Sequence, residues 1–331
     1  MSALQPATLV LGGSGFVGRR VVRSALARAA RSASDPTDDE ELEDVVISAS
    51  REPALGLDGS ETGLVLATFD VAKHGGAAEL LDAFAPRRIV LLTALARIAD
   101  CDAYPGYARA LNVELPGDVA QWTAKHGARL VHVSTDLVFG AAAPPVAGFA
   151  ETDAPAPTSN YGRQKLEGER RVLATDPAAL VVRLPLLWDA RGAGCGASEP
   201  LLDALAKGGR PKLFVDEWRT PLFVDDAAGA LVELAHGSAR GVLHVAGPER
   251  ITRHELGTSL AIASGMPPAE VRRRIAAVKR ADVGMEATRP ADVCLDSTKA
   301  RTEHGLVLPG ASQVLARLAR EHRARSGAER L

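Results

Sequence analysis

The stretch Ala7-Thr-Leu-Val-Leu-Gly-Gly-Ser-Gly-Phe-Val-Gly18 decides the fold class of this chain. A short apolar run ends in glycines at positions 12, 15 and 18, and a helix-like segment, 17–30, follows. We expect the first two glycines to let the backbone turn tightly and approach a pyrophosphate, and the third to let the helix pack close to a sheet. The helix N-terminus adds N–H groups and a positive dipole. The motif predicts a dinucleotide site that uses Gly12, Ser14, Gly15, Phe16, Val17 and Gly18.

Short apolar runs alternate with helical stretches along the first three-quarters of the chain. The runs lie at 45–48, 64–69, 89–92, 129–133 and 180–183, with helical segments such as 77–84, 111–126 and 165–174 between them. Such runs are typical of parallel strands that helices cover on both faces. The pattern predicts an α/β fold, a Rossmann-type doubly wound parallel sheet with a smaller C-terminal substrate-binding lobe.

The end of the second run indicates which cofactor binds. It reads Ser48-Ala-Ser-Arg51 and lacks the acid that would bind a ribose 2′-hydroxyl. Arg51 can pair with a 2′-phosphate, so we favour NADP(H) over NAD(H), the alternative being an ordinary surface arginine. After the next run, the Asp70 carboxylate could accept a hydrogen bond from the adenine amino group. The remaining candidate cofactor-binding residues are Val71, Thr93, Ala94 and Leu95.

Composition excludes several classes of protein. The chain has 331 residues, of which 46% are hydrophobic and 24% charged, so it is long and apolar enough for a real core. A net charge of −2 argues against a nucleic-acid partner or a polybasic membrane surface. Three widely spaced cysteines predict free thiols, no metal and a cytoplasmic location. No apolar run approaches the roughly 20 residues of a membrane helix.

Three local features complete the expected organisation. The run 35–44 holds seven acids in ten residues and is expected to be a solvated loop. The Gly/Ala-rich run 190–198 is either a surface loop or a mobile substrate lid. Thr252-Arg-His-Glu255 has the pattern of a capping box that opens a helix.

The chemistry is concentrated in two segments, Ser134-Thr135-Asp136 and Tyr161-Gly-Arg-Gln-Lys165. The chain has only three tyrosines, and Tyr161 lies four residues before a lysine, so the two side chains share one helix face. A lysine ammonium beside a phenol lowers the phenol pKa and lets it exchange a proton with a carbonyl or alcohol. A hydroxyl from Thr135 can hold the same oxygen. These residues predict a catalytic set of Thr135, Tyr161 and Lys165.

Taken together, the motifs resemble an extended short-chain dehydrogenase/reductase, and within it the dTDP-4-dehydrorhamnose reductase family. The matching segments are 12–18, 134–140 and 161–169, with weaker matches at 216–226 and 289–296. The resemblance implies that Thr135, Tyr161 and Lys165 are catalytic, that NADPH lies over the glycine loop, with Tyr161 and Lys165 also contacting it, and that the substrate lobe follows residue 180. The expected boundaries are 1–180 for the NADP-binding domain, completed by about 220–247, and 181–219 with 248–331 for the lobe.

Departures from the family pattern concern the substrate. Trp218-Arg219 and Pro221-Leu222 replace the family's usual residues, which puts the natural sugar in doubt. Arg219 and Arg289 either bind a pyrophosphate or are ordinary surface arginines. The other candidate substrate-binding residues are Ser134 and Asp136. Leu137 stands where the related dehydratases carry an acid, which argues against water elimination.

The resulting hypothesis is NADPH-dependent reduction of a keto group on a nucleotide-activated sugar. A sugar nucleotide is the expected partner, with neither nucleic acid nor membrane, and the family likeness allows a homodimer or a monomer. One alternative is a non-catalytic NADP-binding subunit, like the regulatory subunit of methionine adenosyltransferase. Another is an epimerase or reductase of a different carbohydrate-like ketone.

Overall fold

The computed structural model describes residues 4–34, 45–52, 60–70, 77–190, 198–286 and 288–328. The chain folds into two compact units that are interleaved along the sequence. The first contains residues 1–138, 159–183 and 227–243, and the second contains 139–158, 184–226 and 244–331. Within the described ranges, no helix is long and apolar enough to cross a membrane.

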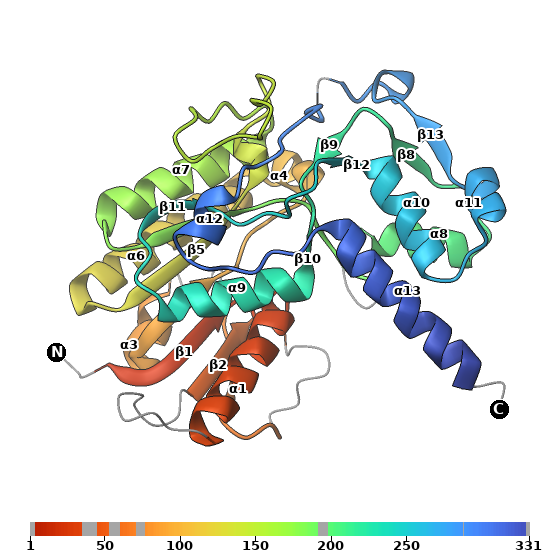
Figure 1. Ribbon diagram of the computed structural model, residues 1–331. Coiled ribbons are helices and arrows are strands. Elements are labelled where there is room, and N and C mark those ends of the chain that lie inside the picture. Colours follow the sequence, from red (N-terminus) through yellow and green to blue (C-terminus); the bar gives the residue numbers. More distant parts are fainter. Residues whose placement is uncertain are drawn as a thin grey trace. The chain divides into compact units, whose positions relative to one another are not determined.

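A seven-stranded sheet forms the centre of the first unit, in the order β11-β6-β5-β4-β1-β2-β3 (Figure 1). Strand β1 pairs in parallel with both β2 and β4, and the chain changes direction of winding there. The strands are β1 (Gln5–Leu11), β2 (Val45–Ser50), β3 (Leu64–Thr68), β4 (Pro86–Leu91), β5 (Arg129–Thr135), β6 (Leu180–Leu184) and β11 (Gly241–His244). The predicted Rossmann-type parallel sheet is confirmed.

Helices flank this sheet because its strands carry apolar residues on both faces. All residues of β1 from Ala7 to Leu11 are buried. One core cluster joins the sheet to α3, α6 and α7, and an Arg28–Glu233 ion pair links α1 to α9. The helices are α1 (Gly18–Ser34), α3 (Ala78–Phe84), α4 (Ile98–Ala103), α5 (Pro105–Arg109), the π-helix η1 (Ala110–Glu114), α6 (Leu115–His126), the 3₁₀ turn η2 (Asp136–Val138), α7 (Asn160–Thr175) and α9 (Val224–His236).

The second unit is built from short strand pairs and helices. Its strands pair as β7 with β10, β9 with β12 and β8 with β13. They are β7 (Leu187–Trp188), β8 (Lys212–Phe214), β9 (Trp218–Arg219), β10 (Leu222–Phe223), β12 (Ile251–Thr252) and β13 (Ala276–Val278). The helices are α8 (Glu199–Ala206), α10 (Arg253–Ala263), α11 (Pro268–Arg274), η3 (Ala281–Val283), α12 (Thr298–Thr302) and α13 (Ala311–Ala328). The predicted capping box of α10 is present, with Thr252 and Glu255 bonding each other's backbone N–H.

The largest difference between the two units and the expected domains, which stay a prediction, concerns one segment. Residues 139–158 were expected within the first domain, but they belong to the second unit. The reason is a bridge between Phe149 and Leu295, far apart in the sequence. The acidic run 35–44, Cys195 and most of the run 190–198 lie outside the described residues.

Candidate active site

The glycine loop joins β1 to α1 in a conformation that requires glycine. Gly12 has φ +93°, which L side chains rarely adopt. A Cβ on Gly18 would lie 2.0 Å from the carbonyl oxygen of Gly12, so α1 packs directly on the loop as expected. Gly15 is exposed, and a Cβ there would meet only Gly12 O at 3.2 Å. The loop therefore leaves backbone accessible at Gly15, where a pyrophosphate could approach.

Two buried polar groups near this loop have no partner in the described part of the chain. Arg19, in the first turn of α1, is 7% exposed, and neither its Nε nor its Nη2 makes a hydrogen bond. Ser48 on β2 is 2% exposed with an unbonded hydroxyl, and a Cβ on Gly13 would lie 2.1 Å from it. A buried guanidinium without a partner is costly, so these groups fit an anionic cofactor. Sequence reasoning missed Arg19, although its place directly after the third glycine was a signal.

The other cofactor candidates lie after the carboxyl ends of β2, β3 and β4. Arg51 is exposed and directly follows β2, and Asp70 is half-buried after β3. Thr93 lies beside the loop, because a Cβ on Gly12 would be 3.0 Å from its backbone nitrogen. Carboxyl ends of neighbouring parallel strands meet at one edge of a sheet, where open α/β folds bind ligands. Val71 lies outside the described residues.

Asn112 fixes the segment after β4. Its side chain accepts a hydrogen bond from Leu95 N (3.0 Å) and donates one to Leu95 O (3.1 Å). It also donates to Gln164 on α7 (3.2 Å). Asn112 lies in η1, and a Cβ on Gly168 of α7 would be 2.3 Å from the Asn112 carbonyl oxygen. Sequence reasoning missed this residue, because nothing in the segment 110–114 indicates a π-helix.

The structure brings the predicted catalytic residues together at the end of β5 and the start of α7. Ser159 caps α7 by accepting a hydrogen bond from Gly162 N (3.1 Å). Tyr161 and Lys165 both face the interior of the first unit. A side-chain hydrogen bond connects Tyr161 to Thr135, whose hydroxyl also donates to Asp136 Oδ1 (3.1 Å). The arrangement can deliver a proton to an oxygen held beside Thr135.

Lys165 is a buried residue of α7, and its ammonium contacts two residues of β5. Its Nζ donates to the carbonyl oxygen of Val133 (2.8 Å) and lies 3.3 Å from Nε2 of His132. Burial lowers the pKa of Lys165 to about 8, although the Glu169 carboxylate acts in the opposite direction. This lysine therefore sits close to losing its charge at mildly alkaline pH.

The pKa of Tyr161 differs from the one expected beside Lys165. Burial raises the pKa of Tyr161, and the Asp136 carboxylate raises it further, while the bond to Thr135 acts in the opposite direction. The prediction of a lowered pKa is wrong because burial, the largest effect, disfavours the phenolate, and Lys165 is not among the groups that shift Tyr161. The phenol is therefore protonated at neutral pH, the state required of a proton donor.

Ser134 has a different environment from its neighbours. Its hydroxyl donates to Glu169 Oε1 (2.5 Å), and Glu169 forms a buried ion pair with Arg183 (2.7 Å). This geometry does not support the predicted substrate contact of Ser134, because the hydroxyl belongs to an internal network. Asp136 is 5% exposed and lies beside Thr135, so its predicted substrate role stays a prediction.

The two predicted substrate arginines share one carboxylate in the second unit. Glu217, which is 1% exposed, pairs with Arg289 (2.7 Å), Arg219 (3.3 Å) and Arg253 (4.0 Å). These pairs hold the pKa of Glu217 below its usual range despite burial, and burial lowers the pKa of Arg253 to about 10. Arg219 is buried, so it is not an ordinary surface arginine. Three guanidinium groups therefore surround one buried carboxylate.

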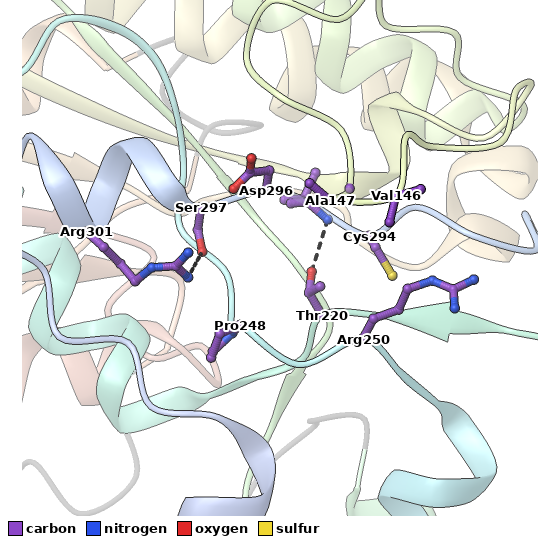
Figure 2. A pocket seen from close by; sticks show the side chains of 12 residues that line it. Val146, Ala147, Thr220, Pro248, Arg250, Cys294, Asp296, Ser297 and Arg301 are labelled. Carbon is purple, nitrogen blue, oxygen red and sulfur yellow. Dashed lines mark hydrogen bonds between the residues drawn. The ribbon is translucent and has the colours of Figure 1, made fainter.

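A separate pocket of about 160 Å³ lies within the second unit (Figure 2). Arg301 donates to Ser297 (3.1 Å) on one side, and Thr220 accepts a hydrogen bond from Leu295 N (3.0 Å) in its wall. None of the residues predicted from the sequence as site residues lines it.

Known proteins resemble this chain over most of its length. A family model described as the RmlD substrate binding domain matches residues 7–323. The probable low-salt glycan biosynthesis reductase of Haloferax volcanii is 30% identical over 253 residues, 75% of this chain and 82% of that protein. Methionine adenosyltransferase 2 subunit beta of Rattus norvegicus is 31% identical over 231 residues, 67% of this chain and 66% of that protein.

Solved structures show the same fold. The dTDP-4-dehydrorhamnose reductase of Bacillus anthracis, in complex with NADP, superposes with a TM-score of 0.72 at 18% identity. The match covers 96% of this chain and 99% of that one. At this level of identity the likeness concerns the fold alone.

Proposed function

The chain belongs to the RmlD substrate binding domain family and is an NAD(P)-dependent oxidoreductase of the short-chain dehydrogenase/reductase type, and from that premise we propose that it reduces a keto group on a nucleotide-activated sugar. The observation that carries the proposal is the cluster of Thr135, Tyr161 and Lys165 at the end of β5 and the start of α7. Ketone reduction needs one proton donor and one hydride donor, and this cluster supplies the first.

A nicotinamide cofactor fits the groups around the glycine loop. Gly15 would give the pyrophosphate access to the backbone, and the partnerless guanidinium of Arg19 would gain an anionic partner. Arg51 would bind a 2′-phosphate, which is why NADP(H) is proposed over NAD(H). When bound, the cofactor supplies the hydride that reduces the ketone carbon.

The chain's own residues supply the proton and the orientation. Thr135 would turn its hydroxyl proton from Asp136 to the carbonyl oxygen and hold it there, and Tyr161 would donate its phenolic proton to the same oxygen. One hydride and one proton convert the ketone to an alcohol and leave Tyr161 as a phenolate, which solvent protonates again. Tyr161 is protonated at neutral pH, which is the state that reduction requires, although its raised pKa makes it a weaker acid than a free phenol.

The substrate proposal draws on the charge of the second unit. Arg289 is 37% exposed at its side chain, while the paired Glu217 is buried. The partly exposed guanidinium of Arg289 would attract the diphosphate of a sugar nucleotide. Homodimer formation and a cytoplasmic location stay predictions.

The experiment that tests the proposal is a substrate panel. The protein is incubated with NADPH and with keto sugars carried on dTDP, on UDP or on no nucleotide, and the loss of NADPH absorbance is followed. Turnover of a nucleotide-linked ketone, inhibited by free dTDP or UDP, is the expected result. Turnover of the free ketone alone would show that the substrate is a carbohydrate-like ketone without a nucleotide. An epimerase would convert the sugar without consuming NADPH.

A second candidate function is a non-catalytic NADP-binding subunit. It is favoured by the likeness to methionine adenosyltransferase 2 subunit beta, of which this chain matches about two thirds. The complete Thr135, Tyr161 and Lys165 set supports the reductase instead. NADPH binding without turnover of any ketone in the panel would favour the subunit.

A further inference from the structure

His132 is a buried imidazole in direct contact with the catalytic lysine. It lies on β5, is 0% exposed, and its Nε2 is 3.3 Å from the Nζ of Lys165. We propose that His132 is a positioning residue that holds the Lys165 ammonium and stabilises its charged form. The functional role of this contact rests on the reductase proposed above, but the contact itself can be tested without any substrate.

The geometry of the ammonium explains the positioning. An ammonium has three N–H donors. The Val133 carbonyl takes one at 2.8 Å, and His132 Nε2 takes the second. Both acceptors belong to neighbouring residues of one strand, so the third N–H has one direction left. Because Lys165 lies on the same face of α7 as Tyr161, that donor remains for the proposed cofactor and reacting groups.

The protonation state of His132 follows from its neighbours. A nitrogen that faces an ammonium can only accept, so the single imidazole proton sits on Nδ1. Burial and the Lys165 charge lower the pKa of His132 well below its usual value, so the ring stays neutral and Nε2 stays available. Across the described residues, Nδ1 has no hydrogen-bond partner. Among the described residues, the imidazole of His132 is therefore hydrogen-bonded to Lys165 through Nε2.

The other charged groups near Lys165 do not replace this role. Glu169, one turn further along α7, favours the charged lysine. Its carboxylate is already bound by Arg183 of β6 and by Ser134 of β5. Tyr161 on α7 carries no charge at neutral pH, since its pKa is raised. His132 and Val133 are thus the direct acceptors of the ammonium.

The test measures the titration of Lys165 itself. The chain has seven lysines, so ¹³Cε-lysine labelling gives seven NMR signals, and loss of one signal in Lys165→Met assigns Lys165. The wild-type Lys165 signal is expected to titrate near pH 8. In His132→Leu the midpoint should fall by about one pH unit, because a hydrogen bond to the charged form is lost. His132→Gln, whose amide oxygen can accept, should restore about half of that shift.

A matched control is available in His244, which is equally buried but bonds Phe149 O in the second unit. His244→Leu should leave the Lys165 midpoint unchanged. An unchanged or raised midpoint in His132→Leu would overturn the proposal. If that variant does not fold, ¹⁵N-histidine labelling of the wild type decides instead. A bare Nε2 below the midpoint supports the proposal, and a protonated Nε2 contradicts it.

Cofactor binding links this result to function. His132→Leu should weaken NADPH binding, measured by cofactor fluorescence, by roughly twofold at pH 7, and the loss should grow between the two Lys165 midpoints and level off at about tenfold above pH 8. Failure of the ketone panel would remove the proposed reaction and leave the NMR midpoints intact. Unshifted midpoints with normal turnover would remove the role of His132 and leave the reductase.

Discussion

The buried charge of Lys165, a proposed catalytic residue, lowers the stability of the folded chain. Its ammonium is 1% exposed, and burial lowers the pKa to about 8 from an ordinary value of 10.5. Between those two values the unfolded chain binds a proton that the folded chain has lost, so the free energy of unfolding rises with pH. Below pH 8 both states carry the proton, and the folded state bears the full cost of the buried charge. That cost is about 3 kcal/mol.

We therefore expect Lys165→Met to raise the free energy of unfolding by roughly 1–3 kcal/mol at pH 7, with the gain disappearing as the pH approaches 10.5. Urea unfolding at several pH values measures this difference. Lys207→Met, at an exposed lysine, is the control and should change little at any pH. A gain in Lys165→Met that did not depend on pH would contradict this account of the buried charge.

At the residue scale, the sequence indicated which residues form the candidate site but did not predict how deeply they are buried or what surrounds them. The scarcity of tyrosine identified Tyr161, because the other two lack a lysine four residues later. The direction of its pKa shift was not predictable, since it depends on burial and on Asp136. His132 and Arg19 could not be distinguished from ordinary residues until the structure showed that both are buried with unbonded nitrogens.

At the scale of elements, the close contact between α7 and η1 depends on one glycine. A Cβ on Gly168 would lie 2.3 Å from the backbone oxygen of Asn112, and Asn112 in turn holds Leu95. Gly229, in the interior of α9, is the matched case, because nothing lies within 4 Å of its Cβ position.

Gly168→Ala should therefore lower the free energy of unfolding by about 2–3 kcal/mol, because α7 and η1 must move apart. Gly229→Ala should raise it by about 0.5–1 kcal/mol through helix propensity alone. Denaturant unfolding of the two variants beside the wild type measures both effects. Equal effects of the same sign would show that α7 tolerates a Cβ at this contact.

Arg19 follows β1 and Arg51 follows β2, and we expect different effects from replacing each of them. Arg51→Gln should reduce the preference for NADPH over NADH at least tenfold, because only NADPH has a 2′-phosphate to lose. Arg19→Gln should weaken both cofactors by a similar factor, because its proposed partner is common to both. Titration of each cofactor by fluorescence gives the two ratios. A selective loss of NADPH in Arg19→Gln alone would reverse the two roles.

Elements were predictable where the hydrophobic pattern was long. Six of the seven central strands coincide with the predicted apolar runs, and the glycine loop follows the first of them, whereas β11 was not among those runs. The predicted helix 111–126 is in fact η1 followed by α6, because a π-turn leaves no trace in apolar spacing. The strands β7, β9, β10 and β12 have two residues each, too few to show any period.

At the scale of the whole molecule, each compact unit collects segments distant in sequence. The second unit draws Glu217, Arg253 and Arg289 from three separate segments to one ionic cluster. The pairing of its arginines with one carboxylate was not predictable, because a shared carboxylate cannot be read from spacing. The bridge between Phe149 and Leu295, which joins residues 139–158 to a distant segment, could not be read from spacing either.

Glu217→Gln should destabilise the second unit by about 3–5 kcal/mol, because it leaves three guanidinium groups without their buried counter-charge. Hydrogen exchange resolved by segment measures the effect. It should be largest in β9, in α10 and around residue 289, while Glu303→Gln, at an exposed glutamate, should have none. Unchanged protection in those segments would show that the cluster does not hold the unit together.

The central claim is that Tyr161 donates the proton in reduction of a nucleotide-linked ketone. Its most direct test is single-turnover reduction by the wild type and by Tyr161→Phe, with NADPH affinity measured on the same samples. The account predicts a rate loss of roughly 10²–10⁴-fold in Tyr161→Phe, with the NADPH dissociation constant within about twofold of wild type. A variant that reduces the ketone at nearly the wild-type rate would contradict it.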